Sequence, residues 1–512
     1  MPRDGQSVHR REGQDEHHHR TARGEGARRA RCLPSGARRP PQARAGWLES
    51  VAASLEENAD ELVRIADEDT HLGEARLQGE LRRTVFQLRL LGAEIVAGEP
   101  LEATIDHADP SWGMGPRPDL RRVNVPLGVV GVFGASNFPF AFSVIGGDSA
   151  SALAAGCAVV HKIHTGHRRL GHRTAEIVIG ALAAAGAPEA LFSTVTGREA
   201  AEALVDHPVV KAIGFTGSTA GGRALFDRAA RRAAPIPFYG ELGSINPVFV
   251  TEKAWQERRD SILTEYAASF TLGMGQFCTK PGLLFAPETE PDDLVAALAP
   301  ALEGHAPALL LTPSLRDGFG DAVAALQATE GVDVLIAGSD DEAPRPTLLR
   351  TTAERVRQNP RILEQEMFGP ATLIVSYRPG TDLCELASLL DGQLTATVHA
   401  EPQEDPADLV AVLAERSGRL LWNGWPTGVS VTYAQHHGGP YPATTAPNAT
   451  SVGTGAIRRF MRPVAYQSFP PEKLPAPLQD ENPWKISRRV NGQWERAERR
   501  QDDAATAVSA GI

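Results

Sequence analysis

One cysteine of the sequence, Cys278, lies in a loop whose flanking glycines and proline allow close approach to a neighbouring part of the molecule. Cys278 stands in Gly275-Gln-Phe-Cys278-Thr-Lys-Pro-Gly282, between glycines and near a proline. A loop thiol can act as a nucleophile when nearby dipoles or charges favour its thiolate. The alternative is a small buried side chain, which is the ordinary role of a single cysteine. The loop alone leaves both interpretations open.

A carboxylate between two glycines is the second candidate. Glu241 lies in Tyr239-Gly-Glu241-Leu-Gly243, just before an apolar segment. We therefore expect it at the edge of a cleft rather than on a solvated helix. It could act as a general base that deprotonates water, or it could simply form a turn.

Two glycine clusters follow apolar segments. The first, Gly128-x-x-Gly131-x-x-Gly134-Ala-Ser-Asn137, departs from the GxGxxG pattern of a standard dinucleotide fold. The second, Gly217-Ser218-x-x-x-Gly222, opens a helix, where backbone N–H groups and the helix N-terminus can face a pyrophosphate. Tight turns also produce such glycines.

The elements that must position these residues alternate between strand and helix. Short apolar segments separated by helical stretches imply an α/β fold whose parallel sheet is covered on both faces. In the first half of the chain we expect strands at 129–133, 158–161, 192–196, 210–215 and 247–250. A second α/β lobe begins near residue 262, with strands at 283–286, 332–337, 371–376 and 395–400. Helical spacing starts at Trp47, and residues 110–126 predict extended arms.

Composition excludes several classes of protein. The 512 residues carry a net charge of −11, which argues against a general nucleic-acid binder. No apolar run approaches the ~20 residues of a membrane helix. Four cysteines without CxxC spacing disfavour a disulfide framework or a zinc ribbon and predict a reduced, cytoplasmic compartment.

The first 46 residues differ from the rest of the chain. They hold eleven Arg, no Lys and five acidic residues, a local net charge of +6. We expect them to be disordered, with a nucleic-acid arm as the alternative. Because the whole chain has six Lys against 46 Arg, as in a GC-rich gene, we hypothesise that this segment is a misread or mis-assigned start.

Six phrases in the same order resemble the aldehyde dehydrogenase superfamily, from about Trp47 to about Pro470. They are Gly134-Ala-Ser-Asn137-Phe-Pro139, Val160-His-Lys162, Gly214-Phe-Thr-Gly217-Ser218, Gly240-Glu241-Leu-Gly243, Gly275-Gln-Phe-Cys278-Thr and Glu366-Met-Phe368-Gly-Pro370. The resemblance implies an enzyme in which Cys278 attacks an aldehyde and forms a thiohemiacetal. Asn137 and the Cys278 N–H would hold the oxyanion. Glu241 would activate the water that hydrolyses the thioester to a free acid.

The resemblance also implies a nicotinamide dinucleotide and no metal. Lys162 would reach the adenosine ribose, Glu366 would bind the nicotinamide ribose, and Phe368 would support that end. Gly217, Ser218 and Gly222 would admit the pyrophosphate. Thr165 stands where NAD-preferring members carry Glu, so NADP as well as NAD is expected. Arg198 would bind the 2′-phosphate, or it is an ordinary surface arginine.

The C-terminal part resembles the 2-oxoglutarate semialdehyde (2,5-dioxopentanoate) dehydrogenases. The phrases are Gln435-His436-His437-Gly-Gly-Pro-Tyr-Pro-Ala, Ser451-Val-Gly-Thr454 and Arg462-Pro-Val464. Arg458 and Arg459 are candidates for binding the substrate carboxylate, or they are solvated helix residues. We expect the His436–His437 pair only to shape its loop. An NADP-linked fatty-aldehyde dehydrogenase and an inactive, N-terminally damaged relative are the alternatives.

The resemblance divides the chain into regions. We expect a Rossmann-type dinucleotide-binding domain at 47–109 and 127–242, and a catalytic domain at 243–450. A small β oligomerisation arm would comprise 110–126 and 451–480, followed by a polar tail at 481–512. The arm predicts a homodimer or homotetramer that binds a small aldehyde, without nucleic-acid or membrane partners.

Overall fold

The computed structural model describes residues 39–339 and 341–497. Helix α2 (Pro41–Glu57) is the first described helix, with a proline in its first turn and Trp47, Leu48 and Val51 buried. The predicted disorder is therefore wrong for residues 41–46, and residues 1–38 lie outside the described part. No helix of the described residues is both long and apolar enough to cross a membrane.

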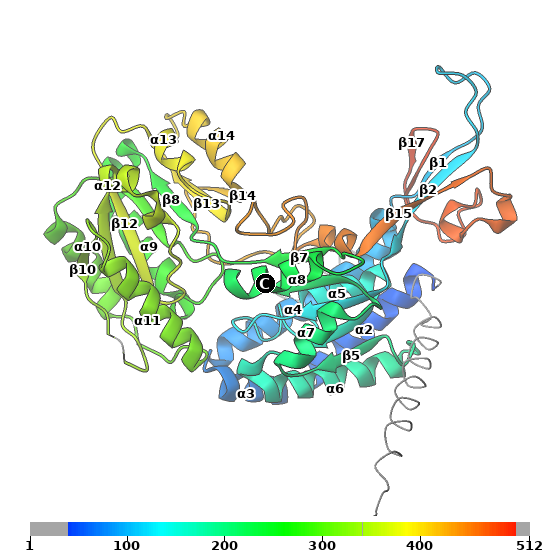
Figure 1. The fold of residues 1–512 in the computed structure, drawn as a ribbon, viewed down its shortest axis with the longest axis horizontal. Coiled ribbons are helices and arrows are strands. Elements are labelled where there is room, and N and C mark those ends of the chain that lie inside the picture. Colours follow the sequence, from blue (N-terminus) through cyan, green and yellow to red (C-terminus); the bar gives the residue numbers. More distant parts are fainter. Residues whose placement is uncertain (1–38, 340, 498–512) are drawn as a thin grey trace, which may run out of the picture.

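The first lobe is built on a parallel sheet in the order β5-β4-β3-β6-β7 (Figure 1). Its strands are β3 (Val129–Phe133), β4 (Ala158–Lys162), β5 (Phe192–Val195), β6 (Val210–Thr216) and β7 (Phe238–Glu241). One face packs on α2, α3 (Ala59–Thr70), α4 (Glu74–Ala97), α5 (Gly147–Ala155) and α6 (Arg168–Ala184). The other face packs on α7 (Arg198–Asp206) and α8 (Thr219–Ala230). The expected α/β architecture is confirmed.

The second lobe contains a larger sheet in the order β10-β11-β12-β9-β8-β13-β14. Its strands are β8 (Pro247–Val250), β9 (Leu283–Pro287), β10 (Asp333–Ile336), β11 (Thr347–Thr352), β12 (Ala371–Tyr377), β13 (Gln393–His399) and β14 (Ser417–Trp422). Helices α9 (Glu252–Thr271) and α10 (Pro291–Glu303) cover one face. Helices α11 (Pro313–Gln327), α12 (Ala353–Gln358), α13 (Leu383–Ser388) and α14 (Ala407–Arg416) cover the other.

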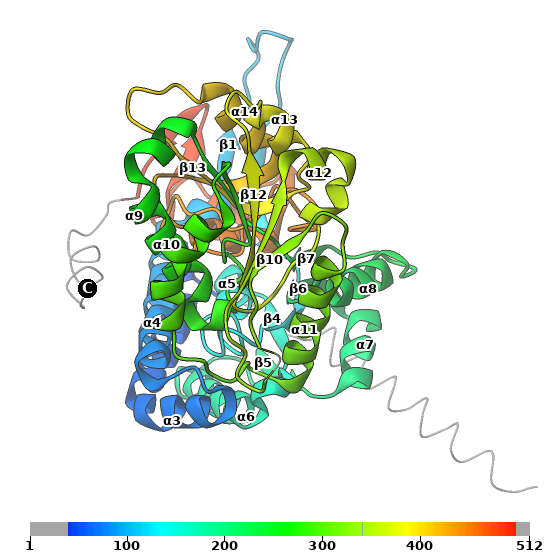
Figure 2. The same cartoon turned by 90° about the vertical axis from the view of Figure 1, so that its left-hand side faces the viewer.

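A third sheet projects from the first lobe and joins segments from both halves of the chain (Figure 1, Figure 2). Its order is β15-β2-β1-β16-β17, where β2 (Leu120–Pro126) pairs antiparallel with β15 (Met461–Gln467). Strand β1 (Thr104–Asp106) joins β2 to β16 (Arg488–Val490), and β17 (Gln493–Glu495) forms the far edge. The last two strands lie within the range that we expected to be a polar tail, so the arm sheet extends past residue 480.

Candidate active site

The Cys278 loop leaves the second lobe through three consecutive residues in the left-handed region of backbone space. Gly273, Met274 and Gly275 have φ values of 55°, 59° and 65°. A Cβ at position 275 would lie 2.1 Å from the Gly369 carbonyl oxygen, so only glycine fits this approach. The backbone at Met274 is strained, which is typical of residues held in place at functional sites.

Asn246 fixes the backbone at the cysteine and just after it. Its Nδ2 donates to the carbonyl oxygens of Cys278 at 2.8 Å and Lys280 at 2.9 Å. Asn246 is fully buried and itself adopts a positive φ of 57°, a conformation that asparagine tolerates better than most residues. We did not single it out from the sequence, where an Asn before Pro247 was its only signal.

The thiol faces a histidine and a carboxylate. Cys278 Sγ lies 3.6 Å from His437 Nε2, and the same nitrogen lies 2.8 Å from Glu241 Oε1. Both His437 and Glu241 are buried, with 1% and 4% of their side chains exposed. Burial disfavours charge on His437, but the Glu241 carboxylate and Cys278 raise its pKa to about 10. Burial would likewise raise the pKa of Glu241, yet His437 and Ser451 hold it below its usual value.

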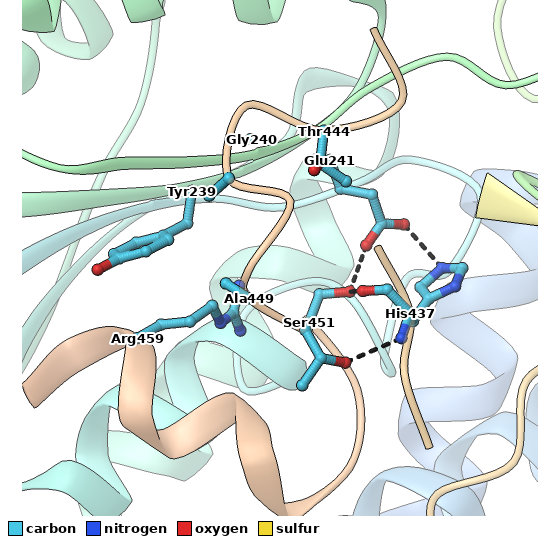
Figure 3. A pocket seen from close by; sticks show the side chains of 10 residues that line it. Tyr239, Gly240, Glu241, His437, Thr444, Ala449, Ser451 and Arg459 are labelled. Carbon is cyan, nitrogen blue, oxygen red and sulfur yellow. Dashed lines mark hydrogen bonds and ion pairs between the residues drawn. The ribbon is translucent and has the colours of Figure 1, made fainter. Parts of the chain in front are cut away.

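The other oxygen of Glu241 accepts a hydrogen bond from the Ser451 hydroxyl (Figure 3). A cavity of about 20 Å³ adjoins this pair and is also lined by Tyr239, His437 and Arg459. This volume can hold one water molecule. Glu241 and His437 line this space, whereas Cys278 does not.

The expectation that the two adjacent histidines only shape their loop is wrong for His437. Its ring contacts both Cys278 and Glu241, and the three potential ligand atoms lie within 4.8 Å of one another. A metal ion could bridge such a spacing, so the absence of a metal stays a prediction.

Asn137 lies beside the cysteine loop, as an oxyanion-binding residue should. Its Nδ2 donates to the Gln276 carbonyl oxygen at 2.9 Å, and its backbone oxygen accepts from Arg76 Nη2 at 2.7 Å. A primary amide has two N–H donors, so the second remains for an oxygen bound near Cys278. The structure thus brings Cys278, Glu241 and Asn137 together around the cysteine loop.

A separate group of predicted residues lies at the carboxyl edge of the first-lobe sheet. Lys162 ends β4 and pairs with Val195 of the neighbouring strand β5. Thr165 follows within three residues of Lys162 and is exposed. Burial lowers the pKa of Lys162, with a further contribution from Arg168. Arg198 begins α7 just after β5, and its exposed side chain lies 3.3 Å from Glu202.

The N-terminus of α8 lies at the same edge. Gly217 and Ser218 are exposed there, and the Ser218 hydroxyl caps the helix by accepting from Gly221 N at 3.3 Å. The free N–H groups of this first turn are suited to an anion. Gly222 is different, because a Cβ there would lie 2.2 Å from Leu242 Cδ2. Its small size is therefore needed for packing inside the lobe.

Comparisons with known proteins agree with this geometry. The aldehyde dehydrogenase family profile matches residues 20–440. The chain belongs to the aldehyde dehydrogenase family. The match includes residues before Trp47, so the expected start of the resemblance was placed too late. It also confirms that the chain is an oxidoreductase of aldehydes.

Two curated relatives share most of their length with this aldehyde dehydrogenase. Alpha-ketoglutaric semialdehyde dehydrogenase 2 of Azospirillum brasilense is 44% identical over 89% of the chain and 88% of its own length. Alpha-ketoglutaric semialdehyde dehydrogenase of Acinetobacter baylyi is 40% identical over 88% of the chain and 87% of its own length. The crystal structure of an E. coli NADP-dependent enzyme superposes with a TM-score of 0.69 at 22% identity, covering 85% of this chain and 87% of that one. This last likeness concerns the fold.

The described residues of this aldehyde dehydrogenase fit a dinucleotide between the two groups. Gly243 N donates to Thr219 Oγ1 at the start of α8, and a Cβ at position 243 would lie 2.4 Å from Glu366 Oε2. Gly243 thus lets Glu366 approach the helix end. Burial raises the pKa of Glu366 to about 7, although Lys280 opposes the shift. Phe368 is half-buried in the same segment.

The two arginines predicted to bind substrate already have carboxylate partners. Arg459 Nη2 pairs with Asp148 Oδ1 at 2.7 Å, and both side chains are buried. Arg458 lies 2.8 Å from Glu102, and both of these side chains are about half exposed. Arg459 lines the cavity beside Glu241, whereas Arg458 does not. Neither guanidinium is free to neutralise a substrate carboxylate.

Proposed function

We propose that this aldehyde dehydrogenase oxidises 2,5-dioxopentanoate to 2-oxoglutarate, with NADP or NAD as the oxidant and Cys278 as the nucleophile. The contact between Cys278, His437 and Glu241 carries the chemistry of this proposal. The names of the two curated relatives support the substrate.

In the first step the Cys278 thiolate attacks the aldehyde carbon and forms a thiohemiacetal. The His437 ring lies 3.6 Å from the sulfur and faces it with Nε2. The free N–H of Asn137 and the Cys278 backbone N–H would stabilise the alkoxide that develops on the aldehyde oxygen. Preorganised donors of this kind contribute about 3 kcal/mol each in related chemistry.

The bound dinucleotide supplies the hydride acceptor that converts the thiohemiacetal into a thioester. Lys162, Gly217, Ser218 and Glu366 would hold it along the sheet edge. Gly222 contributes by keeping α8 close to Leu242. We propose that Thr165 tolerates the 2′-phosphate of NADP because it lacks a carboxylate, and that Arg198 turns from Glu202 toward that phosphate.

In the last step water hydrolyses the thioester, with Glu241 as the base. Acylation removes the negative charge of Cys278, one of the groups that raise the pKa of His437. The pKa of His437 then falls from its raised value, while Glu241 remains its partner at 2.8 Å. The water's proton goes to Glu241, its oxygen bonds to the acyl carbon, and the C–S bond breaks to release the acid and the thiolate.

The test is direct assay of the purified chain. With 2,5-dioxopentanoate and NADP we expect reduced dinucleotide and 2-oxoglutarate in equal amounts. Glu241→Gln should give a single burst of reduced dinucleotide without steady turnover. Faster oxidation of a long-chain apolar aldehyde, or absence of turnover with every aldehyde tested, would contradict the proposal.

We also propose that the arm sheet joins subunits into a homodimer or homotetramer. Its edges are β15 and β17, and exposed aromatic side chains lie on β17 at Trp494 (59%) and two residues after β15 at Phe469 (47%). Open strand edges and exposed apolar groups favour association. Light scattering of the purified chain measures the mass, and a monomer would refute this part.

A further inference from the structure

Two arginines hold one loop beside the active-site cysteine. Arg83 comes from α4 and Arg419 from β14. Arg419 donates from Nη1 to the Gly428 carbonyl oxygen at 3.0 Å and from Nη2 to that of Pro426 at 2.6 Å. Arg83 Nη2 reaches the next carbonyl, that of Val429, at 3.5 Å. The loop at 426–429 therefore lies between two guanidinium groups.

This loop is connected directly to the cysteine. Gly428 N donates to Thr279 Oγ1 at 3.3 Å, and Thr279 follows Cys278 in the chain. A second connection runs through an aromatic ring. Arg83 Cζ lies 5.2 Å from the centre of the Phe142 ring, which lies 6.1 Å from the His437 ring. Both guanidinium groups are therefore linked to the cysteine site, Arg419 through the 426–429 loop and Arg83 through the Phe142 and His437 rings.

Neither arginine forms an ion pair in the described part of the chain, although the charge of Glu80, three residues before Arg83, raises the pKa of Arg83 more than that of Cys278 does. Arg83 Nη1 and Arg419 Nε are buried and donate to no group among the described residues. Burial lowers the pKa of both guanidinium groups, and the charge of Cys278 partly opposes this in each case. A half-buried guanidinium with free donors is stabilised by an anion that accepts from it. This distinguishes the pair from Arg458 and Arg459, whose donors already have carboxylates.

The two other ionisable side chains nearby on α4 have different roles. Glu80 Oε1 accepts from Phe140 N and Ala141 N, both at 2.8 Å, and burial raises its pKa. Glu80 therefore anchors the segment after Asn137. Arg76 donates to the Asn137 carbonyl oxygen and lies over the Phe277 ring at 4.7 Å, so it positions the oxyanion residue.

We infer that Arg83 and Arg419 form an anion subsite that binds the carboxylate of an oxo-acid aldehyde while its aldehyde carbon lies at Cys278. The inference deepens the proposed function and rests on it. Arginine binds carboxylates through parallel N–H donors, which fixes the orientation of the substrate as well as its charge. The subsite selects an aldehyde with an anionic far end over an apolar one.

The experiment compares two aldehydes that differ only at the far end. 4-Oxopentanal has a methyl group where 2,5-dioxopentanoate has its carboxylate. In Arg83→Met and Arg419→Met we expect KM for 2,5-dioxopentanoate to rise about 10- to 100-fold, the usual range for losing a hydrogen bond to a charged group. We expect kcat/KM for 4-oxopentanal to change by less than about threefold, because that aldehyde cannot use the lost charge.

Arg82→Met is the matched control, because Arg82 precedes Arg83 on the same helix and is exposed. It should leave both aldehydes unaffected. Arg83→Lys keeps the charge and should restore part of the preference for the anionic aldehyde. If Arg83→Met fails to fold, as judged by its thermal transition, Arg419→Met provides the same comparison. An equal loss for both aldehydes, or an unchanged preference, would overturn the inference.

A binding measurement separates this inference from the proposed function. If the unmodified enzyme does not favour 2,5-dioxopentanoate over 4-oxopentanal, the proposed substrate is wrong. Calorimetric binding of 2-oxoglutarate to Cys278→Ser protein then tests the subsite alone. Loss of this binding on adding Arg83→Met supports the subsite, and equal binding with and without Arg83 overturns it.

Discussion

Two groups of residues in the proposed active site are built in different ways. We call Cys278, His437, Glu241 and Ser451 the cluster, and the residues at the ends of β4, β5 and β6 the dinucleotide edge. In the cluster, side chains meet from distant segments, since His437 is 159 positions after Cys278 and Ser451 is 210 positions after Glu241. At the edge, exposed residues follow directly from the ends of β4, β5 and β6. The cluster depends on tertiary packing and charge, and the edge depends on local chain geometry. Substitutions in the cluster should therefore have larger effects than substitutions at the edge.

The largest effect should come from removing the nucleophile. Cys278→Ser should lower kcat by at least about 10³-fold, because the whole covalent route is lost. NADPH affinity, measured by fluorescence titration, should change little because the edge is a separate structure. Cys384→Ser, at a partly buried cysteine on α13, is the control and should be fully active. Loss of NADPH binding in Cys278→Ser would show that the two regions are not independent.

Removing the cation beside the thiol should have the next largest effect. His437→Gln should lower kcat about 10²-fold, within the usual range for proton-transfer partners. Because Glu241 and Cys278 raise the pKa of His437 to about 10, the native ring stays cationic through neutral pH. Its loss removes the positive charge that faces the sulfur, so the time profile of iodoacetamide alkylation at neutral pH should become slower. An unchanged alkylation profile would refute this role. His436→Gln, at the adjacent ring, should leave that profile unchanged.

The packing beneath the cysteine can be tested through stability. Asn246→Asp keeps the left-handed backbone preference but removes the donors to the Cys278 and Lys280 carbonyl oxygens. We expect the free energy of unfolding, from urea titration, to fall by about 2 kcal/mol, since buried acceptors lose their partners. Asn482, the control, is half-buried, has a φ of 47° and donates to the Ile486 carbonyl oxygen. Asn482→Asp removes this one donor, so the free energy of unfolding should fall by less. An equal fall in the free energy of unfolding for both variants would mean that the burial of Asn246 does not increase its contribution to stability.

The smallest effect is expected at the dinucleotide edge. Thr165→Glu should weaken NADP binding about tenfold, or 1.4 kcal/mol, by placing a carboxylate near the 2′-phosphate. NAD affinity should be maintained or rise. Thr165→Gln has the same length without the charge and should leave the NADP to NAD ratio nearly unchanged. A fall of similar size for both dinucleotides in Thr165→Glu would place the 2′-position elsewhere.

Sequence reasoning predicted the elements better than the contacts between them. The bounds of β3 and β8 match the expected strands, because short apolar runs there are delimited by Gly and Pro. Cys278, Glu241 and Asn137 were identified because their local phrases are distinctive. His437 could not be placed, because a histidine in a Gly- and Pro-rich loop gives no sign of what it faces.

The arginines show the same limit. Arg83 lies in an amphipathic helix, where an arginine ordinarily points to solvent, and Arg458 stands in a segment that resembles a substrate-binding family. What separates them is the hydrogen-bond partner of each guanidinium, the Glu102 carboxylate for Arg458 and the Val429 carbonyl oxygen for Arg83. That difference depends on partners far away in the chain. It is visible only once the fold brings the lobes together.

The position of Ser451 has a consequence for protein synthesis. A ribosome completes Asn137 and Cys278 long before it reaches His437 and Ser451, and β16, which pairs with β1, comes later still. During that interval the nascent chain carries the nucleophile without its imidazole and carboxylate network. His437 and Ser451 lie in the last fifth of the chain, so the Cys278 thiol and Glu241 acquire these two partners only late in synthesis.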